Sequence, residues 1–206
     1  MHDQTRAGSA ALIIGWIGYI ALMAVHPTRF GGPALGHISL NDAVHWTALG
    51  LMPFLAYGYV SMAQTLGLAR PLPMLGLMFM LFSLFAGLVA GVINGLAAVE
   101  VFEAAARPGA ESFETLKHGF WWLNQAFAAI HYAFAAIATG LFGLAWTQQS
   151  GRRGLGAAGV MISAGFLAWL ATGLWRPDVH GALFVVLPIG AWTVTAAFAL
   201  RKYEAG

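Results

Sequence analysis

The stretch from Pro73 to Ala98 reads PMLGLMFMLFSLFAGLVAGVINGLAA and contains no charged side chain. A helix that crosses a lipid bilayer needs about 20 consecutive, mostly apolar residues, and this stretch exceeds that length. The whole chain has the same character, because 59% of its 206 residues are hydrophobic and only 9% are charged. A soluble domain carries about 25% charged residues. The sequence therefore predicts an all-α integral membrane protein in contact with the lipid bilayer.

Further apolar runs lie on both sides of this stretch, and turns that contain Pro, Gly and Arg separate them. We therefore expect one transmembrane domain, residues 1–206, that forms a bundle of about six helices. The first run could be a cleavable signal peptide, but no clear Ala-x-Ala cleavage site follows it. It is therefore expected to be a retained transmembrane span. The expected spans are residues 9–25, 41–66, 73–98, 119–147, 155–175 and 181–200.

The Lys and Arg residues predict the orientation of this bundle. With six spans, the N-terminus, the second and fourth connections and the C-terminus lie on one side of the membrane. That side carries the larger share of the ten Lys and Arg residues, so the positive-inside rule places both termini in the cytoplasm. The residues on that side are Arg6, Arg70, Arg152, Arg153, Arg201 and Lys202, and those on the other side are Arg29, Arg107, Lys117 and Arg176.

The connection between the third and fourth spans, residues 99–117, is the one sizeable segment expected outside the membrane. A helical pattern continues into it, with Glu103 and Arg107 one helical turn apart, and Pro108–Gly109 breaks this pattern. We expect spans three and four to form a long helical hairpin that projects outward and has an acidic tip. This tip is either solvated without a partner or a docking surface for another membrane protein.

Histidines gather at the outer ends of the expected spans, at His26, His37, His45, His118 and His180. Each of the three helices that run inward begins with a His that follows a carboxylate, such as Asp42 before His45. Neutral imidazole is the commonest protein ligand for transition metals, and a carboxylate can ligate or orient it. We therefore expect His45, His118 and His180 to lie together at the outer mouth and to bind Zn, Cu or Fe. His26 and Asp42 complete this set of candidate metal ligands.

The same pattern has an interpretation without a metal. Carboxylates are favoured near helix N-termini by the helix dipole, and His suits the headgroup region as an amphipathic side chain. The chain also lacks an HxxxH or HExxH motif, which would place two ligands on one helix face.

His131 lies inside the fourth expected span. Trp121 and Trp122 mark the membrane interface, and ten further residues of helix place His131 about 15 Å deeper. Asn124 and His131 share the face with small residues, which is expected to pack inward within hydrogen-bond reach of another helix. An ionisable group in the membrane is a functional candidate, so His131 and Asn124 are candidate cofactor-binding residues. Otherwise His131 is a neutral core residue.

These residues support three hypotheses about function. The first is a membrane protein that binds a metal or haem b at the outer histidines. Haem b would need two His at similar depth, and His131 has no second His at its depth. The second is a non-catalytic accessory or assembly subunit that docks through residues 99–117. The third is a small carrier of protons or of a lipophilic molecule that uses His131, Asn124 and Asn94. The sequence does not decide whether the protein is an enzyme. Nucleic acid is not expected as a partner, since the basic residues form no stripe.

The opening pattern is an apolar span, then His26-Pro27-Thr28, then His37 and His45 at the start of the second span. It resembles small multi-pass proteins of bacterial inner membranes. The resemblance covers most of the chain in hydropathy. It implies a six-helix bundle in the bacterial inner membrane, and it carries no activity or residue roles.

Overall fold

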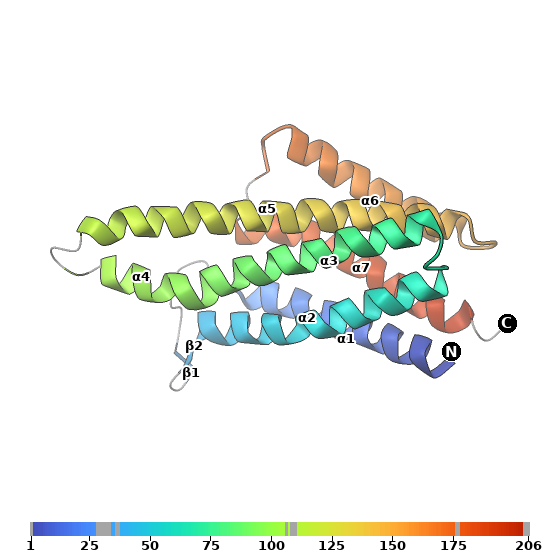
Figure 1. Cartoon of the computed structure of the whole chain (residues 1–206), viewed down its shortest axis with the longest axis horizontal. Coiled ribbons are helices and arrows are strands. Elements are labelled where there is room, and N and C mark those ends of the chain that lie inside the picture. Colours follow the sequence, from blue (N-terminus) through green and yellow to red (C-terminus); the bar gives the residue numbers. More distant parts are fainter. Residues whose placement is uncertain are drawn as a thin grey trace.

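The computed structural model describes residues 2–27, 34–35, 38–105, 107, 111–175 and 178–203, which form a bundle of long helices (Figure 1). The helices are α1 (His2–Val25), α2 (Leu40–Thr65), α3 (Pro71–Val92), the π-helix η1 (Ile93–Ala97), α4 (Ala98–Ala105), α5 (Glu111–Thr147), α6 (Arg153–Ala171) and α7 (Val179–Tyr203). Two short strands, β1 (Ala34–Leu35) and β2 (Ile38–Ser39), pair antiparallel before α2.

Five helices of the described part are long and apolar enough to cross a membrane, and the protein is therefore described as a multi-pass membrane protein. They are Asp3–Val25, Pro71–Ala105, Phe113–Thr147, Arg153–Ala171 and Gly181–Arg201. The sequence predicts about six spans, and the remaining predicted span, residues 41–66, corresponds to α2. This helix has 26 residues but is less apolar than the others, since polar side chains such as Tyr59 and Ser61 occur along it. Both of these side chains are buried in the bundle.

The ends of the helices alternate between the two ends of the bundle. α1 begins and α7 ends at the same end, and the turns from α2 to α3 and from α5 to α6 lie there too (Figure 1). The opposite end contains the end of α1, the start of α2, the π-helix and the start of α7. Helices that alternate in direction in this way form an up-and-down bundle.

Helix α4 and the first part of α5 extend past the other helices at this second end (Figure 1). α5 has 37 residues, which is about 55 Å of helix, whereas the hydrocarbon core of a bilayer is about 30 Å thick. Lys117 forms an exposed ion pair with Glu114 at 3.1 Å in this projecting part. The predicted break at Pro108–Gly109 lies outside the described residues.

A chain of hydrogen bonds connects α1, α2 and α7 inside the bundle. The indole N–H of Trp16 donates to the Tyr59 hydroxyl at 2.9 Å. Tyr59 lies 3.1 Å from the Thr193 hydroxyl, which itself donates to the Ile189 carbonyl at 2.8 Å. The Tyr59 hydroxyl must therefore donate to Thr193, so the polar groups of Trp16, Tyr59 and Thr193 all have a partner. Such contacts join helices in an apolar medium, where burial alone provides little driving force.

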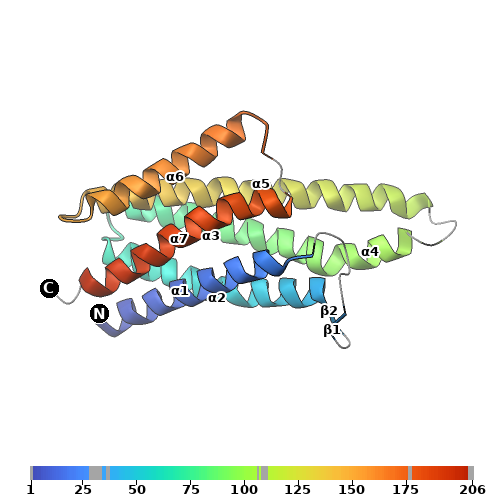
Figure 2. The ribbon, with the colours of Figure 1, turned by 180° about the vertical axis from the view of Figure 1, so that it is seen from behind.

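Helices α5 and α6 approach each other most closely near the turn that joins them. A Cβ atom on Gly156 would lie 2.5 Å from the Thr147 amide nitrogen and 2.6 Å from the Gly143 carbonyl oxygen. A side chain at position 156 is therefore excluded, as in other close helix pairs with small residues. Beyond this point α6 diverges from α5 (Figure 2).

Candidate metal and ligand site

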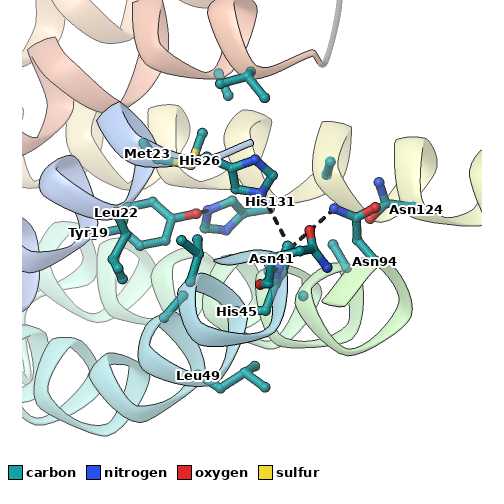
Figure 3. Close-up of a pocket in the computed structure, with 18 of the residues that line it drawn as sticks. Tyr19, Leu22, Met23, His26, Asn41, His45, Leu49, Asn94, Asn124 and His131 are labelled. Carbon is teal, nitrogen blue, oxygen red and sulfur yellow. Dashed lines mark hydrogen bonds between the residues drawn. The ribbon is translucent and has the colours of Figure 1, made fainter. Parts of the chain in front are cut away.

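A cavity of about 290 Å³ lies among α1, α2, α3, η1, α5 and α7, toward the end of the bundle from which α4 projects. Its walls include three histidines, three asparagines and two tyrosines. Figure 3 labels His26, His45, His131, Asn41, Asn94, Asn124 and Tyr19, and the second tyrosine is Tyr132. Most of the other lining residues are apolar, so the cavity combines a few polar groups with apolar walls, as small-ligand sites do.

The three imidazoles are held in the same way. Nδ1 of His45 lies 2.7 Å from the Asn41 carbonyl oxygen, Nδ1 of His26 lies 2.8 Å from the Pro27 carbonyl oxygen, and Nδ1 of His131 lies 2.9 Å from the Ser83 carbonyl oxygen. A carbonyl oxygen only accepts hydrogen bonds, so each Nδ1 must carry a proton. In the neutral imidazole Nε2 then bears a lone pair. This is the tautomer in which metal-ligating histidines are usually held by an outer partner.

His26 and His45 meet at the cavity. Their Nε2 atoms are 3.5 Å apart, and their rings are nearly perpendicular, with centroids 5.0 Å apart. His45 is 7% exposed and His26 is half-buried. Burial lowers the pKa of His26, and its hydrogen bond to Pro27 opposes this effect. When both rings are neutral with Nδ1 protonated, the two Nε2 lone pairs face each other across this gap.

Asn94 is the third polar group at this point. Its side-chain nitrogen Nδ2 donates to Nε2 of His45 at 3.2 Å (Figure 3). Asn94 belongs to the π-helix η1, which interrupts the regular α3–α4 rod. π-helical turns are rare and often occur at functional sites. The wider turn places Asn94 on the cavity wall together with Gly91 and Ala90 of the preceding helix.

Two glycines make room for the imidazoles. A Cβ atom on Gly95 would lie 2.2 Å from the Cβ of His45, and one on Gly87 would lie 2.8 Å from Nδ1 of His131. Contacts this short do not occur in proteins, so both histidines pack directly on the backbone of the α3–η1 rod. Gly91, between them, would only meet the end of Leu49 at 3.4 Å.

The prediction that His131 faces the bundle interior and bonds another helix is confirmed. His131 is 8% exposed, and Ser83 on α3 accepts its Nδ1–H and also donates its hydroxyl to the His131 carbonyl at 2.8 Å. Nε2 of His131 points toward the hydroxyl of Tyr19 on α1, at 3.5 Å (Figure 3). His131 and Asn124, the candidate cofactor-binding residues, line the same cavity as His26 and His45.

The structure does not bring His118 to His45, as the predicted layer of His45, His118 and His180 requires. His118 is exposed on α5 and does not line the cavity. The physical reason is that α5 begins beyond the other long helices (Figure 1), and its contribution to the cavity wall begins only at Trp121. The side chain of His180 and the whole of His37 lie outside the described residues.

Asp42 is also not on the cavity wall. It occupies the first turn of α2, where its amide N–H donates to the Ser39 side chain at 3.1 Å and caps the helix. Within the described ranges, no group of three or more His, Cys, Asp or Glu side chains is arranged to hold a metal ion. The structure instead brings together two histidines and an amide.

Sequence reasoning missed Tyr19, Asn41 and the two glycines that hold the imidazoles. A signal for the glycines was available, because Gly87, Gly91 and Gly95 are spaced by four residues and share one helix face. Tyr19 and Asn41 had no such signal, since their side chains reach the cavity only through the packing of α1 and α2.

Comparisons with family models, with curated proteins and with solved structures give no match to this chain.

Proposed function

We propose that this protein is a multi-pass membrane protein that binds one transition metal ion of the Zn²⁺ or Cu²⁺ class through His26 and His45. The observation that carries the proposal is the distance of 3.5 Å between two Nε2 atoms that both present lone pairs, because each Nδ1–H is committed to a backbone carbonyl. Nδ2 of Asn94 can donate to the His45 lone pair at 3.2 Å, whereas a metal ion between the two rings would accept both lone pairs.

The distance between the two nitrogens discriminates among the acceptors. A direct hydrogen bond needs a proton that neither Nε2 carries, and a separation of about 2.7–3.2 Å. One water that donates to both nitrogens would hold them about 4.5 Å apart. A tetrahedral zinc ion with bonds of about 2.0–2.1 Å would hold them about 3.3–3.4 Å apart. The observed 3.5 Å is closest to the metal.

Asn94 would supply a third ligand atom. Nitrogen and oxygen of a side-chain amide exchange places by a 180° rotation, which would bring the Asn94 oxygen to the position now 3.2 Å from Nε2 of His45. Two imidazoles and a carbonyl oxygen suit Zn²⁺ or Cu²⁺ and leave a fourth position open, as in catalytic zinc sites. The cavity of about 290 Å³ is at the lower limit for small-molecule sites, which favours an ion over haem b.

We further propose that α2 crosses the membrane together with the five more apolar helices, so that both termini are cytoplasmic and the metal site opens to the outside of a bacterial inner membrane. Support comes from the 26-residue length of α2, from its position beside α1 and α3, and from the larger share of Lys and Arg at the end where α1 begins. His131 and Asn124 would then form the deeper wall of the site. A docking role for residues 99–117 stays a prediction.

The metal site is tested by titrating the detergent-purified, chelator-treated protein with Zn²⁺ in a calorimeter and by elemental analysis after desalting. We expect one Zn²⁺ per chain, and we expect His26→Ala and His45→Ala each to abolish stoichiometric binding. His118→Ala is the matched control, because His118 is exposed and outside the cavity, and it should bind like the unaltered protein. Zn²⁺ binding that survives both cavity substitutions, or no Zn²⁺ binding at all, would overturn the proposal.

The orientation is tested with a C-terminal fusion in bacteria. We expect a C-terminal alkaline phosphatase to be inactive and a C-terminal green fluorescent protein to be fluorescent, because both reporters would be in the cytoplasm. Fusions placed after Val25 should give the opposite pattern, since α1 then ends outside. An active phosphatase at the C-terminus would contradict the proposed orientation.

A further inference from the structure

The rim of the cavity carries a negative charge. Among the described residues that line the cavity, Asp178 is the one charged side chain, and neither Lys nor Arg occurs. Asp178 is exposed as well as lining the cavity, so it marks a place where the cavity reaches the surface. Its Oδ1 atom accepts the Gly181 amide N–H at 2.7 Å. A carboxylate accepts several hydrogen bonds, so Oδ2 remains for a ligand.

The ends of the nearby helices do not cancel this charge. α7 begins at Val179, and the start of a helix contributes about half a positive charge. α1 ends at Val25, next to His26 on the cavity wall, and the end of a helix contributes about half a negative charge. The start of α2 carries its own carboxylate, Asp42. The negative charge of Asp178 therefore remains, and the cavity favours a cation.

The uncharged polar groups of the wall add acceptors for hydrogen bonds. His26 keeps a lone pair on Nε2 when its neutral ring donates from Nδ1 to the Pro27 carbonyl. Nδ2 of Asn94 donates to His45, which leaves the amide oxygen of Asn94. The side chain of Asn124 is half-buried, lines the cavity (Figure 3) and forms no hydrogen bond with the described residues. A ligand that brings N–H groups would match these acceptors.

Trp121 adds an aromatic ring at the rim. It is 44% exposed and lines the cavity one turn before Asn124 on α5, so the two side chains share a helix face. Among aromatic side chains, the face of Trp attracts an ammonium group most strongly. The buried Met23 and Met52 belong to the apolar part of the wall, and a volume of about 290 Å³ suits a short alkyl chain.

We infer that the cavity binds a small primary alkylammonium ion, with the ammonium group at the rim and the alkyl chain inside. The ammonium group donates to the Asp178 carboxylate and to the Asn124 amide oxygen, and it lies against the Trp121 ring. This inference goes beyond the proposed metal site and does not rest on it, because none of these three residues is a proposed metal ligand.

The inference is tested by calorimetric titration of the detergent-purified, chelator-treated protein at pH 7, without added metal. The probes are butylammonium, which keeps its charge at this pH as a Lys side chain does, butan-1-ol as an uncharged molecule of the same shape, and butyrate as an anion. We expect saturable binding of butylammonium alone, after subtraction of the heat from protein-free detergent. No saturable binding, or equal affinity for butan-1-ol, overturns the inference. Failure of Zn²⁺ to bind would leave it standing.

Asp178→Asn separates the charge of Asp178 from its place at the start of α7. Asn caps a helix as well as Asp does, so the bond from the Gly181 amide should persist. Butylammonium affinity should fall by about 10-fold or more, the usual effect of losing a charged hydrogen-bond partner. Asp42→Asn is the matched control, because it removes the same charge from a helix start that does not line the cavity. Equal butylammonium affinities in the two variants would contradict the inference.

A second pair of variants tests the aromatic contact. Trp121→Leu should weaken butylammonium by roughly 3-fold or more, the usual size of a cation–π contact. Trp122→Leu is the control, because Trp122 is the next residue on the same helix, is 65% exposed and does not line the cavity. It should bind butylammonium like the unaltered protein. If the two Trp variants bind butylammonium equally well, the ammonium group does not lie on Trp121 as inferred.

Discussion

Gly95→Ala is expected to lower Zn²⁺ affinity by about 100-fold, the upper range for residues that position a metal ligand. The added Cβ would lie 2.2 Å from Cβ and 2.3 Å from Cγ of His45. Neither atom is at the end of a flexible chain, so the start of α2 must move away from η1 and carry Nε2 of His45 out of its position opposite His26. The same displacement should lower the free energy of unfolding by about 1–3 kcal/mol, as overpacking usually does.

Gly91→Ala is the matched control for this variant. Gly91 lies one turn earlier on the same face, and an added Cβ would meet only the Cδ2 atom of Leu49 at 3.4 Å. Zn²⁺ affinity and thermal unfolding in detergent should therefore stay close to those of the unaltered protein. If Gly95→Ala binds Zn²⁺ as tightly as Gly91→Ala does, the contact between Gly95 and His45 does not position the His45 imidazole.

Gly156→Ala is expected to destabilise the bundle by about 1–3 kcal/mol or more. Its Cβ would lie 2.5 Å from the Thr147 amide nitrogen and 2.6 Å from the Gly143 carbonyl oxygen. Both are backbone atoms of α5, which cannot rotate away as a side chain can, so the two helices must separate along their contact. The change is measured as the shift in the midpoint of unfolding by a denaturing detergent.

Gly154→Ala tests whether this effect comes from the contact or from the helix itself. Gly154 belongs to the same helix, α6, and an added Cβ has nothing within 4 Å. Both positions lie in the first turn of α6, where Ala forms helix at least as readily as Gly, so Gly154→Ala should unfold no earlier than the unaltered protein. Equal midpoints for the two variants would show that α5 and α6 are not held at this contact.

The two glycine positions illustrate how the membrane environment shapes this fold. Apolar side chains gain little by leaving lipid for the bundle interior, so helices associate where backbones can approach and where polar groups can pair. The Gly143–Gly156 contact is of the first kind, and the Trp16–Tyr59–Thr193 chain is of the second. The His26–His45 pair differs from both, because its two Nε2 atoms do not satisfy each other.

The bounds of two helices followed closely from the sequence. The predicted span 41–66 corresponds to Leu40–Thr65 and the span 181–200 lies within Val179–Tyr203, because Pro, Gly and Arg turns interrupt the apolar runs at these places. The π-helix η1 was not predicted, and the predicted span 73–98 runs through it. A π-turn differs from an α-turn by one hydrogen-bond register, and hydropathy does not report that difference.

The sequence predicted several residues of the site but not how they are arranged. His26, His45, His131 and Asn124 were all candidates, and all four line one cavity. The sequence placed His26 and His45 in an outer metal layer and His131 and Asn124 in a separate inner group, whereas one cavity is lined by both groups. His118 was assigned by its place in the chain, and α5 extends too far for that place to reach the cavity.

The sequence by itself determined that the chain is helical and apolar enough for a membrane, since hydropathy adds up locally along the chain and needs no partner. It also determined that histidines occur near one end of the helices. Only the tertiary structure decided which of them meet. That depends on the rotation of each helix about its axis, and contacts such as Gly95 with His45 and Gly87 with His131 determine the rotation. These contacts join residues that are far apart in the chain. The local sequence pattern around one residue does not indicate which distant residue will contact it.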